Sequence, residues 1–496
     1  MRDRLPGAWY GRAVVACLAI GWCGAAAAAP PKKAPRGRAD GPLAAFAGAE
    51  GFGTETTHAR GKPVFVVTRL DDAQPPEPGQ FRHALAAAQA AGGGYVVFAV
   101  AGTIQLKRPA EIPSHTYVAG QSAPGDGVAI MGAPITIGRY RGAGVNDVVM
   151  RFMRYRGRAK AGADFVEITR PETRNVVLDH VSVSFFQDGA VDLTHGVRDV
   201  TLQWCHFGDA AESGTDEPYH CEPHLIMGGC DRLSMHHNLY THCHSRVPGG
   251  YPDNPGMQIE FVGNVIYNYR KYPTLLSAEK GRGNVVGNVY LAGVNTHGGQ
   301  RPPIQGGNGF QAFVKDNWSF GGTGHDNKIA EKVQGKEKDQ HVLRGKPKAV
   351  QGVRTTGSEP ETVIGEKLEF AAAPFDMPAI ACGPAAENAP LVIARFGALP
   401  HDGTDRRIQK EVLTGTGEWK LATPDDGNAY AGQPQPDADA DGMPDAWEKK
   451  RGGRNLAPNG HDLDAGYENI EVWLDERAAE LIAAAGAAKF TPPAAR

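Results

Sequence analysis

The chain has 496 residues, with 64 glycines, 36 prolines and a formal net charge of −3. It is long enough for one large domain with appendages, and this much glycine suits a turn-rich β protein better than a helical bundle. No basic stripe accompanies the small negative charge, which argues against a nucleic-acid partner.

The first 29 residues have the pattern of a secretory signal peptide. Three arginines precede the apolar run 13–23, and the alanines at 25–29 offer a small-residue cleavage site. A membrane anchor is the weaker interpretation because the run is short, and no later stretch is long enough to span a membrane. We therefore expect a secreted protein, extracellular or periplasmic, whose mature form makes no membrane contact. Residues 30–45 read as a flexible Pro/Gly/Lys/Arg linker.

Ordered structure is expected from residue 46 onwards. Residues 64–68 predict a strand, and residues 79–91 have the alanine content and spacing of a short amphipathic helix. Short strands separated by glycine and proline follow. We expect them at 95–100, 103–106, 116–119, 128–131 and 135–137.

A short strand-like phrase recurs from residue 146 to 320. Its copies occupy 146–156, 174–185, 198–207, 231–240, 257–267, 283–291 and 310–320. Several copies carry an asparagine after the apolar strand, namely Asn238, Asn264, Asn288 and Asn317. A period of this size, with strands too short to bury a face alone, indicates a solenoid. An all-β parallel β-helix over 46–320, with an asparagine ladder at one corner, fits best.

Two carboxylates end the stretch NVVLDHVSVSFFQDGAVD at 175–192. Asp188 and Asp192 are four residues apart, so that either a helix or an extended chain would leave both on one side. This arrangement suits a site for a hard cation, an acid/base pair or a solvated face. The stretch alone leaves all three open.

The C-terminal part divides into two regions. Residues 321–430 form long loops and a wrap, with a short helix at 405–413. Residues 431–485 form a tail that ends in a helix at 472–485. The tail contains DADADGMPDAWE, which matches the spacing of an EF-hand calcium loop, including glycine at the sixth position. The oxygen ligands would be Asp437, Asp439, Asp441, Asp445 and Glu448. The competing interpretation is a solvated acidic tail.

Cysteine and histidine gather between residues 205 and 244. Five cysteines follow the signal segment: Cys205, Cys221, Cys230, Cys243 and Cys382. They could form two disulfides, although the pairing cannot be read from sequence. Seven of the 17 histidines lie in 206–244. Because their spacings fit no standard zinc pattern, we favour a histidine-rich loop pinned by disulfides over a metal centre.

Several ordered blocks together resemble the extracellular bacterial pectate lyases of polysaccharide lyase family 1. They include AGAEGFGTET (47–56), VAGQSAPGDGVAI (118–130), HHNLYTHCHSRVP (236–248) and FVGNVIYN (261–268). The resemblance covers about 46–320 and resumes in the tail. It implies a right-handed parallel β-helix and eliminative cleavage of an acidic polysaccharide, pectate (polygalacturonate), with Ca²⁺ as cofactor. We expect the protein to act as a monomer.

The resemblance also assigns site residues. Asp188 and Asp192 match the family's paired calcium ligands, Asp164 matches its upstream aspartate, and Arg246 matches its catalytic arginine. Arginine is a weak base in water because its guanidinium almost never deprotonates, so the chemistry would depend on calcium and on enforced geometry. The alternative role for Arg246 is binding of a substrate carboxylate.

The chain departs from the family pattern at two places. Gly249 stands where the family has a second arginine, and no lysine occurs between Lys160 and Lys271, where the family's substrate-binding lysine is expected. Two other functions therefore remain as alternatives. One is a pectin hydrolase or esterase on the same scaffold, and the other is a glycan-binding β-helix with little or no activity.

Overall fold

The computed structural model describes residues 43–138, 142–157, 165–210, 222–269, 273–296, 304–320, 348–350, 368–418, 427–451 and 455–489. The predicted signal segment, most of the linker and Asp164 lie outside these ranges. None of the helices in the described part has the length and apolar character needed to cross a bilayer.

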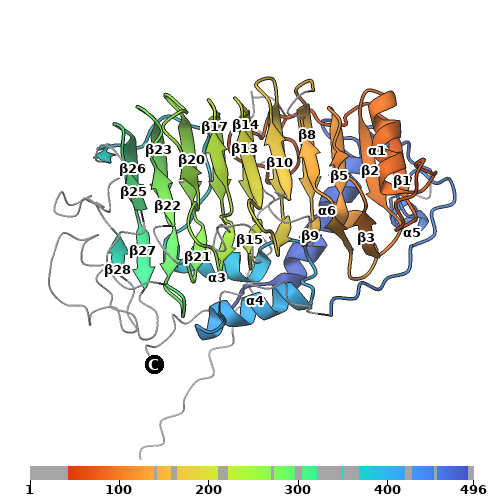
Figure 1. Cartoon of the computed structure of the whole chain (residues 1–496). Coiled ribbons are helices and arrows are strands. Elements are labelled where there is room, and N and C mark those ends of the chain that lie inside the picture. The colour runs from red at the N-terminus through yellow and green to blue at the C-terminus, as the bar shows by residue number, and fades with distance from the viewer. Residues whose placement is uncertain are drawn as a thin grey trace, which may run out of the picture.

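The chain winds into a parallel β-helix, as predicted, with three long sheets that run along its axis (Figure 1). Each full coil contributes one strand to each sheet. The first sheet contains β1 (Val64–Val67), β2 (Gly94–Phe98), β5 (Thr116–Ala119), β8 (Asn146–Arg151), β11 (Arg174–Asp179), β14 (Arg198–Gln203), β17 (Asp231–His236), β20 (Gln258–Val262), β23 (Arg282–Val286), β26 (Gln311–Lys315) and β29 (Glu369–Phe370).

The second sheet contains β3 (Gly102–Leu106), β6 (Val128–Gly132), β9 (Arg154–Arg156), β12 (Ser182–Ser184), β15 (His206–Gly208), β18 (Leu239–Thr241), β21 (Val265–Tyr267), β24 (Val289–Leu291), β27 (Asn317–Phe320) and β28 (Lys348–Val350). The third sheet contains β4 (Ala110–Glu111), β7 (Ile135–Ile137), β10 (Val166–Thr169), β13 (Val191–Thr194), β16 (Leu225–Met227), β19 (Gly249–Gly250), β22 (Thr274–Leu276) and β25 (Ile304–Gly306). Among these strands, β27 and β28 pair in antiparallel orientation.

Apolar side chains of successive coils stack inside the β-helix. On the first sheet, Val176 of β11 pairs in register with Val148 of β8 and Val200 of β14, and all three are buried. The repeats found in the sequence therefore correspond to the coils. Because a single coil cannot bury its own apolar face, each depends on its neighbours for the core.

The predicted asparagine ladder runs along the corner between the first and second sheets. Asn264 donates from Nδ2 to the Met235 carbonyl and to Asn288 Oδ1, both at 2.9 Å, and the Asn238 backbone N–H donates to Asn264 Oδ1 at 2.9 Å. Asn317 continues the series beneath Asn288. The amides thereby satisfy buried backbone groups where the chain turns.

A stack of aromatic rings lies beside this ladder. Each ring belongs to the residue that comes just before the ladder position in its coil. The ring of His180 lies 4.7 Å from Phe152 and 6.0 Å from Trp204, and Trp204 lies 4.6 Å from His237. All four residues have a left-handed backbone conformation, with φ between 52° and 55°. The Asp179–His180 pair belongs to this corner, and Asp179 also accepts from Arg151 Nε at 2.7 Å. Its contacts are structural.

Five α-helices and one 3-10 turn complete the described fold: α1 (Phe81–Ala90), η1 (Gly120–Ser122), α3 (Ala385–Arg395), α4 (Gly403–Thr414), α5 (Asp445–Lys450) and α6 (Asn469–Ala485). The helix α1 lies at the N-terminal end of the β-helix (Figure 1). Apolar residues of α3 and α4 pack on the outer face of the second sheet, and α6 packs on the first sheet.

A buried ion cluster fixes α4 to the second sheet. Arg156 of β9 contacts Asp405 at 2.8 Å and Asp402 at 3.0 Å, and the neighbouring Arg154 is completely buried. Asp402 also caps α4 by accepting from the Asp405 backbone N–H at 2.8 Å. The motif HDGTDRRI at 401–408 therefore attaches the C-terminal wrap to the β-helix.

The disulfide expectation is wrong for the described cysteines. Cys205, Cys230, Cys243 and Cys382 are all free thiols. The first three point into the buried core, where they act as small apolar side chains. Cys221 lies outside the described residues.

Candidate active site

An open groove of about 560 Å³ lies along the outer side of the third sheet. It brings together Asp188, Asp192 and Arg246, three residues that the sequence singled out from two different coils. The remaining lining residues are Leu225, Met227, Tyr251, Pro252 and Asp253. The groove thus combines carboxylates, one guanidinium and an apolar strip.

The two aspartates of the groove have different local structures. Asp192 lies within β13, and its Oδ1 accepts from the Leu225 backbone N–H at 2.9 Å. Asp188 lies in the turn before that strand, and its carbonyl accepts from the Glu222 backbone N–H at 3.1 Å. The sequence left open whether the two aspartates lie on a helix or on an extended chain; the structure shows a bend between Phe185 and β13.

The sequence analysis missed a third carboxylate, Glu167. It occupies β10 directly beside Asp192 of β13, in the register of the parallel pair. Burial raises the pKa of Glu167 above its ordinary value, although His195 opposes this effect. The signal was present in the sequence, because VEIT and VDLT align as equivalent strands of successive coils. Asp164, the predicted upstream ligand, lies outside the described residues.

The donor set suits a hard divalent cation. Ca²⁺ takes oxygen ligands from several carboxylates, and Asp188, Asp192 and Glu167 offer carboxylates from two adjacent coils. Their oxygens are not drawn together as closely as those of the C-terminal loop described below. Like charges on neighbouring strands repel each other, so a cation between them would draw the carboxylates inward.

Arg246 reaches the groove from a residue with a left-handed backbone, at φ 58°. Its Nε forms an ion pair with Glu222, and its guanidinium carbon lies 5.2 Å from the centre of the Tyr251 ring. The space that Arg246 needs explains Gly249. A Cβ at Gly249 would lie 2.6 Å from Cγ and 2.8 Å from Cβ of Arg246.

The histidines of 206–244 that the structure describes serve the fold. His206 is buried between Thr241 and Asp405, and His224 bonds the Val191 carbonyl at 2.7 Å. Burial lowers the pKa of His224 to about 4. Over the described ranges, no cluster of histidine and cysteine donors is close enough to hold a metal. Residues 211–221, with His220, are outside these ranges.

The C-terminal acidic loop does gather three of its five predicted ligands. Single carboxylate oxygens of Asp437, Asp439 and Asp441 lie within 4.8 Å of one another. Asp441 Oδ2 is buried without a hydrogen-bond partner, and burial, together with the carboxylates of the loop and Glu448, raises the pKa of Asp441 to about 7. These properties fit a cation site. Asp445 instead accepts from the Ala438 backbone N–H at 2.9 Å.

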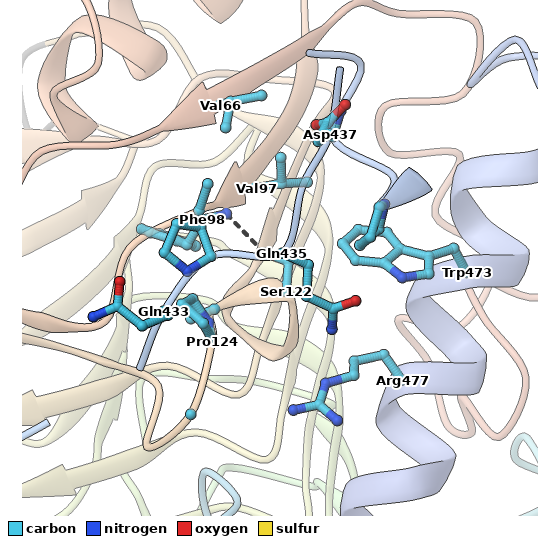
Figure 2. Close-up of a pocket in the computed structure, with 16 residues that line it drawn as sticks. Val66, Val97, Phe98, Ser122, Pro124, Gln433, Gln435, Asp437, Trp473 and Arg477 are labelled. Carbon is cyan, nitrogen blue, oxygen red and sulfur yellow. Dashed lines mark hydrogen bonds between the residues drawn. The ribbon is translucent and has the colours of Figure 1, made fainter. Parts of the chain in front are cut away.

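This loop lies against the first coils of the β-helix (Figure 2). A cavity of about 130 Å³ is lined by Asp437 and Gln435, by Val97 and Phe98, and by Trp473 of α6. Gly442 has φ 93°, and a Cβ there would lie 2.9 Å from Val64 Cγ1. The glycine therefore serves both the turn of the loop and its close contact with β1.

Comparisons with known proteins point to pectate lyases. The chain is 28 % identical over 443 residues to a probable pectate lyase C of Emericella nidulans, a match that covers 87 % of this chain and 92 % of that protein. A probable pectate lyase C of Aspergillus fumigatus is 27 % identical over 448 residues, which are 87 % of this chain and 93 % of the relative. These relatives are fungal, so they support a relationship to pectate lyases but not to the bacterial branch.

More distant matches occur among solved structures. A pectate lyase of Bacillus sp. N165 in complex with trigalacturonate is 14 % identical, with a TM-score of 0.43, over 71 % of this chain and 99 % of that one. At this distance the match adds no argument about activity. No protein-family model matches the chain.

Proposed function

We propose that the protein is a secreted, Ca²⁺-dependent polysaccharide lyase that cleaves polygalacturonate or a related uronan by β-elimination. The observation that carries the proposal is the meeting of Asp188, Asp192 and Arg246 in one groove on the third sheet. The similarity to proteins named pectate lyase over 87 % of the chain supports it.

The reaction removes the proton at C5 of a uronate and expels the oxygen at C4, which leaves an unsaturated sugar. Asp188, Asp192 and Glu167 would hold Ca²⁺, with Asp164 as a further candidate ligand. A bound calcium ion supplies positive charge next to the substrate carboxylate and so stabilises the enolate-like transition state.

Arg246 is the candidate catalytic residue because it is the cationic side chain among those that line the groove. As the candidate base, Arg246 would take the C5 proton on a nitrogen of its neutral form, while the departing C4 oxygen takes up a proton from water. In the alternative role, the charged guanidinium would donate hydrogen bonds to a substrate carboxylate. The ring of Tyr251 and the side chains of Leu225 and Met227 would contact the apolar faces of the sugar rings. These contacts would align the chain of the polysaccharide along the groove.

Two further parts of the proposal concern export and the tail. The signal-like segment 1–29 supports secretion, and the acidic loop supports a second calcium site held by Asp437, Asp439 and Asp441, with Asp445 and Glu448 near it. That loop packs on the N-terminal coils, and its residues are far in sequence from those of the groove. Its calcium would stabilise the fold and take no part in the reaction.

The test is product analysis with a panel of uronans. The purified protein should release unsaturated oligosaccharides, detected by their ultraviolet absorbance, in the presence of Ca²⁺ and none after chelation. Arg246→Ala and Asp192→Ala should abolish the product. Saturated reducing ends would identify a hydrolase, and release of methanol an esterase. Binding of uronans without any product would identify a glycan-binding protein.

A further inference from the structure

Glu222 is a buried acid that neither the sequence motifs nor the proposed calcium site accounts for. Its side chain is 9 % exposed and lies next to Arg246, which lines the groove. The carboxylate contacts three consecutive residues of the following coil. It forms an ion pair with Arg246 Nε, accepts a hydrogen bond from Ser245 Oγ, and lies 3.2 Å from His244 Nδ1.

The backbone of Glu222 connects to the other side of the groove. Its N–H donates to the Asp188 carbonyl at 3.1 Å, and Glu222 forms a parallel bridge with Gly189. The same residue therefore touches the coil that carries Asp188 through its backbone and Arg246 through its side chain. Relative displacement of the two coils would break one of these contacts.

The electrostatics keep this carboxylate charged. Burial raises its pKa, but the hydrogen bonds from His244 and Ser245 and the charge of Arg246 outweigh burial, so that the pKa of Glu222 lies below its ordinary value. A carboxylate that pairs with an arginine on the Nε side leaves the four N–H groups at the two terminal nitrogens for another acceptor.

We propose that Glu222 is a positioning residue that fixes the guanidinium of Arg246 at a set distance from Asp188 and Asp192. The geometry assigns Nε to Glu222 and one face of the guanidinium to Tyr251, which leaves the terminal nitrogens for the substrate. This inference rests on the proposed function, because it supposes that Arg246 acts on a uronate held by the groove.

A purely structural role for Glu222 and a positioning role predict different effects of its removal. If Glu222 only stabilised the fold, its removal would lower the thermal stability and the amount of active protein. The kcat of each folded molecule would remain at the wild-type value. If it positions Arg246, removal lowers kcat in the folded enzyme, since a displacement of about 1 Å at a reacting group can cost about 100-fold in rate. KM should change far less than kcat.

The experiment compares Glu222→Ala, Glu222→Gln and Glu222→Asp in the calcium-loaded enzyme. We expect Glu222→Ala to reduce kcat by about 100-fold and formate to restore part of that rate. Glu222→Gln should reduce kcat less, because the amide keeps the size of the side chain and an oxygen beside Nε. Thermal unfolding identifies any variant that fails to fold. If Glu222→Ala does not fold, the kcat values of Glu222→Gln and Glu222→Asp still test the inference.

Asp199→Ala is the matched control, because Asp199 forms a comparable ion pair with Arg232 on the first sheet, away from the groove. It should leave kcat unchanged. Wild-type kcat in folded Glu222→Ala and Glu222→Gln would overturn the inference, as would a loss confined to KM or a lack of rescue by formate. A wild-type protein that makes no unsaturated product would instead refute the proposed function.

Discussion

Glu167 and Asp192 occupy paired positions on adjacent parallel strands, so that two carboxylates stand side by side on the outer face of the third sheet. Strands in a sheet lie about 4.8 Å apart, a spacing at which two like charges repel each other. A carboxylate pair of this kind is a disadvantage for stability unless a cation lies between its members. The pairing therefore makes Glu167 a candidate for the calcium ligand that the sequence analysis placed at Asp164.

Removing charge from this pair should weaken calcium binding. We expect Glu167→Gln to lower calcium affinity by about 10-fold or more, with activity recovering at higher Ca²⁺, and Asp192→Asn to be impaired more strongly. Calorimetric titration of Ca²⁺ and activity at several concentrations of Ca²⁺ measure both effects. Unchanged affinity in Glu167→Gln would return the role of upstream ligand to Asp164.

Gly249 should not tolerate a side chain while Arg246 keeps its position. Gly249→Ala places a Cβ 2.6 Å from Arg246 Cγ, so we expect the arginine to move and activity to fall by at least about 10-fold, at a cost in stability of about 1–3 kcal/mol. Gly249→Arg, which restores the second arginine of the family pattern, should also lose activity. Gly383→Ala is the control, because a Cβ there meets nothing within 4 Å. A fully active Gly249→Ala enzyme would contradict this view of Arg246.

The asparagine ladder should contribute strongly to stability. Asn264→Ala leaves the Met235 carbonyl and the Asn238 backbone N–H without their partners, and each buried group left unpaired costs about 1–3 kcal/mol. The free energy of unfolding, measured with urea, should fall accordingly. The same substitution at exposed Asn459 should have little effect. Equal stability of the two variants would mean that the ladder is dispensable.

Stability should depend on pH through Glu260. Burial raises its pKa from 4.5 to about 7, the nearby charge of Glu50 acts in the same direction, and the hydrogen bonds with Asn284 and Ser234 oppose it. The folded state therefore binds the proton more tightly, so the contribution of Glu260 is complete below about pH 4.5 and is lost as the pH rises towards 7. The loss is of the order of 3 kcal/mol at most.

Glu260→Gln provides the measurement for this pH dependence, because its neutral amide resembles the protonated acid. The melting temperature of the variant should exceed that of the wild type at pH 8 and approach it at pH 4.5. If the two curves of melting temperature against pH run parallel, Glu260 does not titrate in this range.

Calcium should raise thermal stability through the C-terminal loop independently of catalysis. Binding to the folded state alone adds about 2.7 kcal/mol at about 100 times the dissociation constant. Asp441→Asn should reduce this gain while activity at saturating Ca²⁺ remains, and exposed Asp376→Asn should behave like the wild type. Differential scanning calorimetry with Ca²⁺ or chelator measures the effect. An Asp441→Asn variant with the full gain would exclude the loop as a calcium site.

The sequence was informative where local pattern and tertiary structure agree. The coils followed from the repeat and the ladder from Asn238, Asn264, Asn288 and Asn317. The helix predicted at 79–91 from alanine content and spacing is observed at 81–90, and the one predicted at 405–413 is observed at 403–414. The helix α3 was missed, since Pro390 interrupts its pattern. The meeting of Asp188, Asp192 and Arg246 was expected only because a family resemblance aligned them.

The remaining site residues depend on contacts between coils, which no local pattern carries. Glu222 lies 24 residues before Arg246 and carries no motif, so its role follows only from the fold. Glu167 could have been found by aligning the strands of successive coils. The disulfide expectation failed because free thiols and disulfide-bonded cysteines look alike in sequence, whereas the structure shows free thiols buried in the core.

The packing of α6 on the earliest coils affects how the protein unfolds. Trp473 and Leu474 bury themselves with Tyr95 and Tyr117, so residues near the two ends of the described chain share one apolar cluster. A bare solenoid loses its coils one after another from an end, because each contacts only its neighbours. Here a distant segment holds the coils at the N-terminal end, which penalises fraying from that end and favours loss of the whole structure in a single cooperative step.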